Sequence, residues 1–397
     1  MGGFRERAGR PKCDEMQLLP DRPRVAGSAL TTPHFLLLYA AMLVAAAGNT
    51  ALQSVMPGIG REIGISDFWV TVSYTWSAIL WVTLAPLWAR QSDRHGRKAL
   101  TLVGIGGFIV SMTLCGLALL AGLRGVLAGG LTFAAFGICR AIYGSLGSAT
   151  PSATQAYLAS RTRRSSRVGA LSALASSFSL GTIIGPALAP LFVLPLFGLS
   201  GPLFIFAAIA IVVFLAILLG LPDDKKPRHG RGSGHGAAMS YPSLASTPTG
   251  ASVIAATRPK GHAIRWTDVR IRRWITAGVI AGHAQAATLA CIGFFVIDRL
   301  HLAPHGSEEE ISIVMMAGAA ATLAAQWGLI PKLGLGPRSL ILWGAMIGSL
   351  GMGVTMFASD LYGIVLGFGL TNLGFGLTRP GFTAGASLAV PLSDQGA

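Results

Sequence analysis

The sequence predicts an all-α membrane protein, and three observations support this fold class. Hydrophobic residues make up 52% of the 397 positions and charged residues only 12%, against about 25% charged residues in an average soluble domain. Ten apolar runs reach the roughly 20 residues that a helix needs to cross a bilayer. The cations lie in short clusters between these runs. Membrane β-strands would instead alternate polar and apolar residues over about 10 positions, so helices are expected.

The apolar runs define ten predicted spans along the chain. They are residues 35–57, 69–88, 99–121, 126–158, 168–190, 201–221, 274–297, 311–331, 339–358 and 361–390. The fourth and the tenth are longer and more polar than the others. We therefore expect one face of each of these two helices to line something other than lipid.

The connections between the spans alternate between cation-rich and cation-poor segments. Lys and Arg gather in residues 1–33, 89–98, 161–167, 222–273 and 332–338. Few cations occur in residues 60–68, 123–125, 197–202 and 298–310. Because Lys and Arg in loops stay on the cytoplasmic side, the amino terminus is predicted to be cytoplasmic and the protein to lie in the cell (inner) membrane. The net charge of +15 is thus interpreted as a topology signal, and nucleic-acid binding is not expected.

A long basic linker separates six predicted spans from four. Residues 222–273 are rich in Lys, Arg, Gly, Ser and Pro and cannot bury enough apolar surface to fold alone. The predicted organisation is an amino-terminal cytoplasmic arm (1–33), a six-helix bundle (34–221), the linker (222–273) and a four-helix carboxyl-terminal bundle (274–397).

A weak internal repeat connects the two bundles. The segment from Phe136 to Arg140 (FGICR) recurs from Phe375 to Arg379 (FGLTR) at an offset of 239 residues. At nearly the same offset, Gly96 between the second and third spans corresponds to Gly336 between the eighth and ninth. Parallel repeats around a midplane site are a transporter architecture, so the sequence predicts a parallel two-bundle repeat.

Three motifs give the chain a resemblance to the major facilitator superfamily. The segment Asp93–Lys98 (DRHGRK) is similar to the family's loop signature between the second and third spans. The segment Arg140–Gly144 resembles its second motif, and Gly181–Pro186 resembles the Gly-x-x-x-Gly-Pro motif of its drug:proton antiporter branch. The resemblance implies a major-facilitator-type transporter that works by alternating access.

The loop motif is expected to be a cytoplasmic gate. Its residues are Asp93, Arg94, Gly96, Arg97 and Lys98. The aspartate is expected near the start of the third helix, inside a turn that covers residues 89–98. By resemblance, it would face an eleventh span, and Arg97 would face an acidic residue at the end of the fourth, where this chain has Ser160. The family usually has twelve spans, so we predict that the chain is truncated after its tenth.

Six residues are the predicted lining of a midplane cavity: Asn49, Gln53, Arg140, Tyr143, His283 and Arg379. A mid-membrane arginine costs ~2.5–3.5 kcal/mol, so Arg140 must either line a cavity and bind substrate or be satisfied by helix carbonyls. Arg379 occupies the equivalent repeat position. Guanidinium groups do not release protons, which leaves His283 as a candidate proton carrier or, alternatively, a hydrogen-bonding residue in helix packing.

Small residues in the fifth span form a predicted packing face. Gly181 and Gly185 lie one helical turn apart, and lacking Cβ atoms they allow a neighbouring helix to approach closely. Pro186 removes one backbone hydrogen bond. The expected role is a hinge or a seal between the bundles.

The predicted function is proton-coupled export of small organic compounds. Organic-anion uptake or exchange is one alternative, and a truncated, non-transporting membrane protein is another. No enzyme motif and no metal-ligand spacing is present in the sequence, so we expect no catalytic activity, no metal and no cofactor, with a proton gradient as the driving force. The expected partners are the lipid bilayer and a small-molecule substrate, and the expected state is a monomer.

Overall fold

The computed structural model describes residues 32–162, 167–223 and 268–389, and this part of the chain is helical. The first bundle contains α1 (Thr32–Glu62), α2 (Asp67–His95), α3 (Arg97–Leu123), α4 (Gly129–Ile142), the π-helix η1 (Tyr143–Gly147), α5 (Ala149–Arg161), α6 (Arg167–Leu188), the 3₁₀ turn η2 (Pro190–Phe192) and α7 (Gly201–Gly220). The second contains α9 (Val269–Leu300), α10 (Glu308–Leu323), the π-helix η3 (Ala324–Leu329), α11 (Ile330–Leu333), α12 (Pro337–Phe357) and α13 (Leu361–Leu388). Pairing of extended backbone within these ranges is limited to one isolated bridge. The predicted all-α fold is confirmed.

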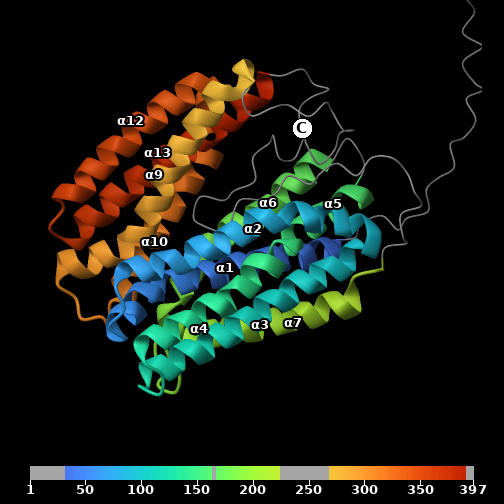
Figure 1. The fold of residues 1–397 in the computed structure, drawn as a ribbon. Helices are drawn as coiled ribbons and strands as arrows, with labels where there is room; N and C mark the ends of the chain where they lie inside the picture. The colour runs from blue at the N-terminus through green and yellow to red at the C-terminus, as the bar shows by residue number, and fades with distance from the viewer. Residues whose placement is uncertain (1–31, 163–166, 224–267, 390–397) are drawn as a thin grey trace, which may run out of the picture.

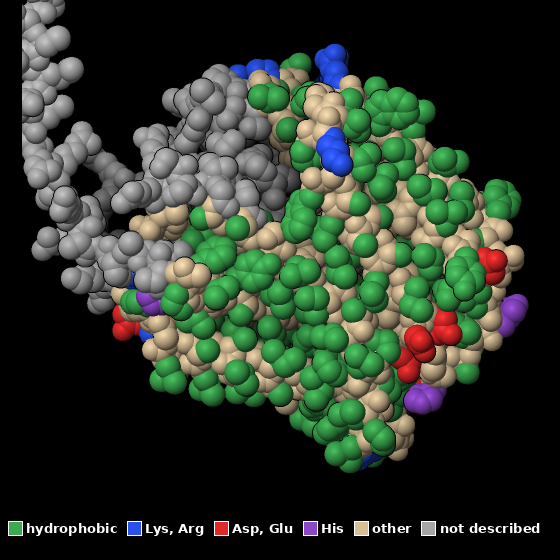
Figure 2. All heavy atoms as spheres, turned by 180° about the vertical axis from the view of Figure 1, so that it is seen from behind, with side chains coloured by type: hydrophobic (Ala, Val, Ile, Leu, Met, Phe, Trp, Pro, Cys, Tyr) green, Lys and Arg blue, Asp and Glu red, His purple; other side chains and the backbone are tan. Residues whose placement is uncertain are grey.

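Each of the ten predicted spans corresponds to a helix or to a run of consecutive helices. Within the described ranges, eight stretches are long and apolar enough to cross a membrane. The other two spans are α6 and the run α4–η1–α5, in which the π-helix η1 interrupts the α-helix. Apolar side chains cover much of the surface shown in Figure 2, as lipid contact requires.

The helices form two bundles that Figure 1 shows in blue to green and in orange to red. In the first, α1 packs against α6 and α7, and α3 packs against α4, α5 and α7. In the second, α13 packs against α9, α10 and α12. Gly344 and Gly374 bring α12 and α13 close together, since a Cβ at Gly344 would lie 2.6 Å from the Gly374 carbonyl oxygen. Such close backbone approach is typical of packing between membrane helices.

The two bundles repeat the same arrangement in parallel. The helix α4 packs against α2 and α3, while α13 packs against α10 and α12. The third span begins at Arg97 and the ninth at Pro337, 240 residues apart. The predicted parallel repeat is therefore present in the structure.

The predicted turn at residues 89–98 is almost entirely helical, which corrects the sequence-based expectation. The helix α2 continues to His95, and α3 begins at Arg97. Gly96 alone separates them, with a φ of 94° that glycine tolerates better than any other residue. Asp93 thus lies in the last turn of α2 rather than at the start of the third helix. The prediction placed the end of the helix where the apolar run ends, but helical backbone bonds do not require apolar side chains.

The seventh span begins earlier than expected. The helix α9 starts at Val269, and the Asp268 carboxylate caps it by accepting a hydrogen bond of 2.9 Å from the Arg270 backbone N–H. Hydrogen bonds from the Arg270 side chain and backbone lower the pKa of Asp268 to about 2. Residues 269–273 of the predicted linker are therefore part of α9, and residues 224–267 of that linker lie outside the described residues.

Contacts between the bundles gather at the end that carries the α1–α2 and α9–α10 turns, here called the distal end. The helix α1 contacts α9 and α10, and α6 contacts α10. Ile183 of α6 packs against an apolar cluster of the second bundle that includes Ile311 and Met315. The seam therefore lies away from the end where the 222–273 linker begins and ends.

Candidate functional site

Arg140 is completely buried within the first bundle, at the end of α4. Its Nη2 donates a hydrogen bond to Oδ1 of Asn49 on α1. Its Cζ lies 4.8 Å from the ring centroid of Tyr143 and 5.4 Å from that of Tyr74 on α2. Three spans thus converge on one guanidinium group.

These partners explain how a buried arginine is tolerated. The faces of the tyrosine rings are negative and attract a cation that lies over them, and the Asn49 oxygen accepts a charge-assisted bond. The Arg140 guanidinium is thus stabilised by the Asn49 amide and by the rings of Tyr74 and Tyr143, which carry no formal charge of their own.

No carboxylate of the described residues is embedded in the middle of a span. Asp93 lies in the last turn of α2, and the others occur within one turn of a helix end or outside the helices: Glu62, Asp67, Asp223, Asp268, Asp298, Glu308, Glu309, Glu310 and Asp360. The core of the first bundle accordingly holds a fixed positive charge at Arg140.

A second set of contacts fixes the backbone around Arg140. The Ser77 hydroxyl of α2 donates a 3.1 Å hydrogen bond to the Arg140 carbonyl oxygen. One turn on, a Cβ at Gly144 would lie 2.5 Å from the Ser77 carbonyl oxygen, so only glycine allows this approach. The π-helix η1 begins at Tyr143, and short π-helical segments inside α-helices occur frequently at functional sites. Trp81 and Tyr143 have ring centroids 5.4 Å apart.

Sequence reasoning missed the contribution of α2 to this site. Tyr74, Ser77 and Trp81 are spaced at i, i+3 and i+7, which places them on one helical face, and the structure directs that face to α4 and η1. The i, i+3, i+7 spacing on α2 can be recognised in the sequence. It does not indicate which neighbouring helix packs against that face.

The structure brings three of the six predicted cavity residues into contact: Asn49, Arg140 and Tyr143. Gln53 is half-buried one turn further along α1. His283 is exposed on α9, with Nδ1 2.8 Å from the Val279 carbonyl oxygen of its own helix. Arg379 is half-buried on α13 of the second bundle.

The gating-loop motif has an acidic contact at the end of α7. Lys98 Nζ lies 3.0 Å from Oδ1 of Asp223, which follows the sixth span. Ser160, at the position where an acidic residue was expected by resemblance, donates a 2.7 Å bond to the Tyr157 carbonyl oxygen. The basic end of the loop thus pairs with the sixth span. Asp93 and Arg94 lie in the last turn of α2.

The glycine motif of α6 faces α1 within the same bundle, which differs from the expected seal between bundles. A Cβ at Gly181 would lie 2.5 Å from the Leu43 carbonyl oxygen, and one at Gly185 would clash with the Ala47 carbonyl oxygen. The α1 backbone is the surface that these glycines accommodate. Pro186 lies near the end of α6, which continues to Leu188.

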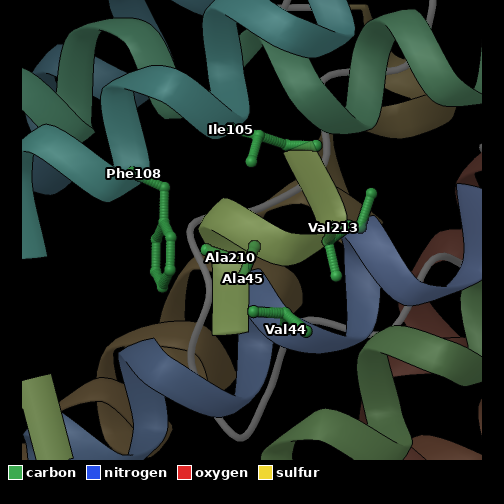
Figure 3. A pocket seen from close by; sticks show the side chains of 7 residues that line it. Val44, Ala45, Ile105, Phe108, Ala210 and Val213 are labelled. Atoms are coloured by element: carbon green, nitrogen blue, oxygen red, sulfur yellow. The ribbon is translucent and has the colours of Figure 1, made fainter. Parts of the chain in front are cut away.

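An apolar crevice between α1, α3 and α7 is unsuited to be the substrate site (Figure 3). Its lining is Ala41, Val44, Ala45, Ile105, Phe108, Ala210 and Val213. It offers no polar group and no room for a water molecule.

The sequence of the chain matches that of a known family over nearly its whole length. The profile of the Major Facilitator Superfamily matches residues 38–397. The chain belongs to the major facilitator superfamily. Together with the helical bundles, this makes it a multi-pass membrane protein of a transporter family.

Individual relatives show how far this likeness extends. The multidrug resistance protein MdtG of Proteus mirabilis (strain HI4320) is 27% identical over 186 residues, which is 46% of this chain and 43% of that protein. The chain thus spans less than half the length of this curated relative in the match.

Three solved structures of transporters share the fold. The human organic anion transporter MFSD10 (TETRAN) has a TM-score of 0.53 at 17% identity, covering 92% of this chain and 86% of that chain. The nucleoside transporter NupG has a TM-score of 0.60 at 11% identity, covering 91% and 88%. A bacterial homologue of the iron transporter ferroportin has a TM-score of 0.52 at 16% identity, covering 91% and 86%. At these identities the likeness establishes the fold and not the substrate.

Proposed function

We propose that this protein is a proton-coupled exporter of small organic compounds that works by alternating access of its two bundles. The proposal includes insertion in the inner membrane with the amino terminus in the cytoplasm, as the cation-rich connections predict. Substrate would bind on the first bundle, near Asn49, Gln53, Arg140 and Tyr143, with His283 and Arg379 contributed by the second.

The observation that carries the proposal is the arginine site itself. A buried guanidinium beside two tyrosine rings combines one polar anchor with apolar, aromatic surface, which suits organic molecules of mixed character. The partial likeness to a multidrug resistance protein supports export as the direction. His283 is the candidate proton carrier, because an imidazole ring can both accept and donate a proton.

A second candidate substrate class is organic anions. It is favoured by the fixed charge of Arg140, together with the absence of an embedded carboxylate from the described residues. An anionic group would pair with the guanidinium and offset the cost of its burial. In this mechanism the protein would take up or exchange anions without a proton.

Transport in proteoliposomes distinguishes these candidates. The purified protein is reconstituted, a pH gradient is imposed, and the fluxes of ethidium (an organic cation) and fluorescein (an organic anion) are compared. Proton-coupled export predicts ethidium movement that stops when nigericin collapses the gradient. Fluorescein flux that ignores the gradient would establish the anion alternative, and no flux of either probe would contradict both.

The role of the arginine site is tested in the same vesicles. Arg140→Ala should abolish flux, whereas Arg124→Ala should retain it. Arg124 is the matched control because it is exposed in the α3–α4 turn, where it donates a 2.7 Å bond to the Leu196 carbonyl oxygen.

A further inference from the structure

A guanidinium group at the distal end joins the two bundles. Arg61, in the last turn of α1, forms two hydrogen bonds to the Asp67 carboxylate at the start of α2, at 2.7 Å from Nε and 2.6 Å from Nη2. The same side chain contacts Asp298 of α9, at 3.0 Å from Nη1 to Oδ1 and 3.0 Å from Nη2 to Oδ2. Arg61 and Asp67 belong to the first bundle and Asp298 to the second.

The backbones of the two bundles also meet around this ion cluster. A Cβ at Gly58 of α1 would lie 2.8 Å from the carbonyl oxygen of Pro304, in the α9–α10 turn. A Cβ at Gly293 of α9 would clash with the ring of Pro57. The Arg61 guanidinium further lies 5.8 Å from the ring centroid of Phe294. The seam is therefore closed at the distal end in this conformation.

We propose that Arg61 and Asp298 form a latch that holds the distal ends of the bundles together and must break before the transporter opens there. Alternating access requires the bundles to rock about the site between them, and that motion separates Asp298 from Arg61. These are positioning residues, since they act on the substrate path through the orientation of the bundles.

The second carboxylate explains why the latch can open. When Asp298 leaves, the charge of Arg61 must be compensated by another carboxylate or by water. Asp67 moves with Arg61 because both belong to the first bundle, and its two hydrogen bonds to the guanidinium persist when Asp298 leaves. The arrangement is asymmetric: one pair stays and one pair breaks.

The expected strength of the breakable pair is small. The Arg61 side chain is 31% exposed and that of Asp298 is 59% exposed, and exposed ion pairs contribute modestly to stability. Loss of the pair should raise the ratio of distally open to distally closed molecules roughly 1.5- to 5-fold. A contact of this strength biases the equilibrium without locking the transporter in one state.

Distances between spin labels measure this ratio without a substrate. The latch proposal can therefore be refuted while the proposed transport function holds, and the reverse. In a full-length background with all four cysteines replaced by serine, labels are placed at Val126→Cys and Ser359→Cys, which are exposed residues in the α3–α4 and α12–α13 turns of the distal end. Pulsed electron–electron double resonance, measured on the protein in nanodiscs, then reports the distance between the two spin labels and thus between the bundles. Asp298→Asn should shift the population toward the longer distance.

Three matched variants separate a latch from a general stabilising role. Asp298→Glu should restore the wild-type distribution, and Glu309→Gln, an exposed carboxylate in the first turn of α10, should leave it unchanged. Asp67→Asn should not shift the population toward the longer distance, because the bond to Asp298 remains and the open state loses its compensating carboxylate. An unchanged distribution in Asp298→Asn, or an equal shift in Asp67→Asn, would overturn the proposal.

Discussion

Asn49→Ala tests whether the buried guanidinium of Arg140 depends on its amide partner. The substitution deletes the Oδ1 acceptor on α1 and leaves a cation that is 0% exposed. Its tyrosine neighbours remain, but a ring face cannot replace a hydrogen-bond acceptor for the Nη2 donor. We therefore expect the first bundle to lose stability, while membrane insertion is retained.

The magnitude follows from the kind of bond that is lost. Hydrogen bonds to charged groups contribute ~1.5–3 kcal/mol. At 2–4 °C per kcal/mol for a unit of 150–250 residues, the melting temperature should fall by roughly 3–12 °C. The control Ser54→Ala removes a buried hydroxyl on the same helix that donates a neutral hydrogen bond to the Ala51 carbonyl oxygen, so it should cost less than about 1 kcal/mol.

A double-mutant cycle assigns the effect to the pair. Thermal unfolding of the purified protein in detergent is measured for Asn49→Ala, for Arg140→Met and for both together. Once methionine has replaced the charge, the Asn49 oxygen has no cation to bind, so its loss should cost much less than in the wild type. If Asn49→Ala lowers the melting temperature equally in both backgrounds, Asn49 does not act through Arg140 and the reasoning is refuted.

Three further predictions concern the same two bundles. Arg140→Ala should abolish flux while the amount of protein in the membrane stays constant, and retained flux would contradict a role in transport. Gly185→Ala should destabilise the α1–α6 contact by about 1–3 kcal/mol, whereas Gly137→Ala, with no atom within 4 Å of its added Cβ, should not lower the melting temperature. Gly293→Ala should lengthen the distal label distance because the new methyl meets α1, whereas Gly282→Ala on the same helix has open space, and an equal effect of both would refute the close seam.

The sequence predicted where the chain crosses the membrane more accurately than where each helix ends. An apolar run of about 20 residues must form its backbone bonds internally in lipid, so the run itself specifies the helix. Polar residues at the boundary carry no such requirement. For this reason α2 continues through the charged segment to His95 and α9 begins at Val269, both outside the predicted limits.

The candidate site could be predicted in part. Arg140 was identifiable because a charge in the middle of an apolar run is costly wherever it lies, and Asn49 and Tyr143 were named beside it. Tyr74 and Ser77 were not, since the face that α2 presents to α4 depends on how the two helices are rotated. The glycines of α6 were recognised as a packing surface, but their partner was α1 instead of the other bundle.

The sequence by itself determined the all-α membrane fold, the ten spans, the parallel repeat and the family. These properties follow from hydrophobic length and short motifs, which are local. Only the tertiary structure decided the partners of the charged residues: Arg140 reaches Asn49 across 91 positions, and Arg61 reaches Asp298 across 237. Such pairs depend on the relative rotation and tilt of whole helices, which arise from packing along their entire length and are not encoded in any one segment.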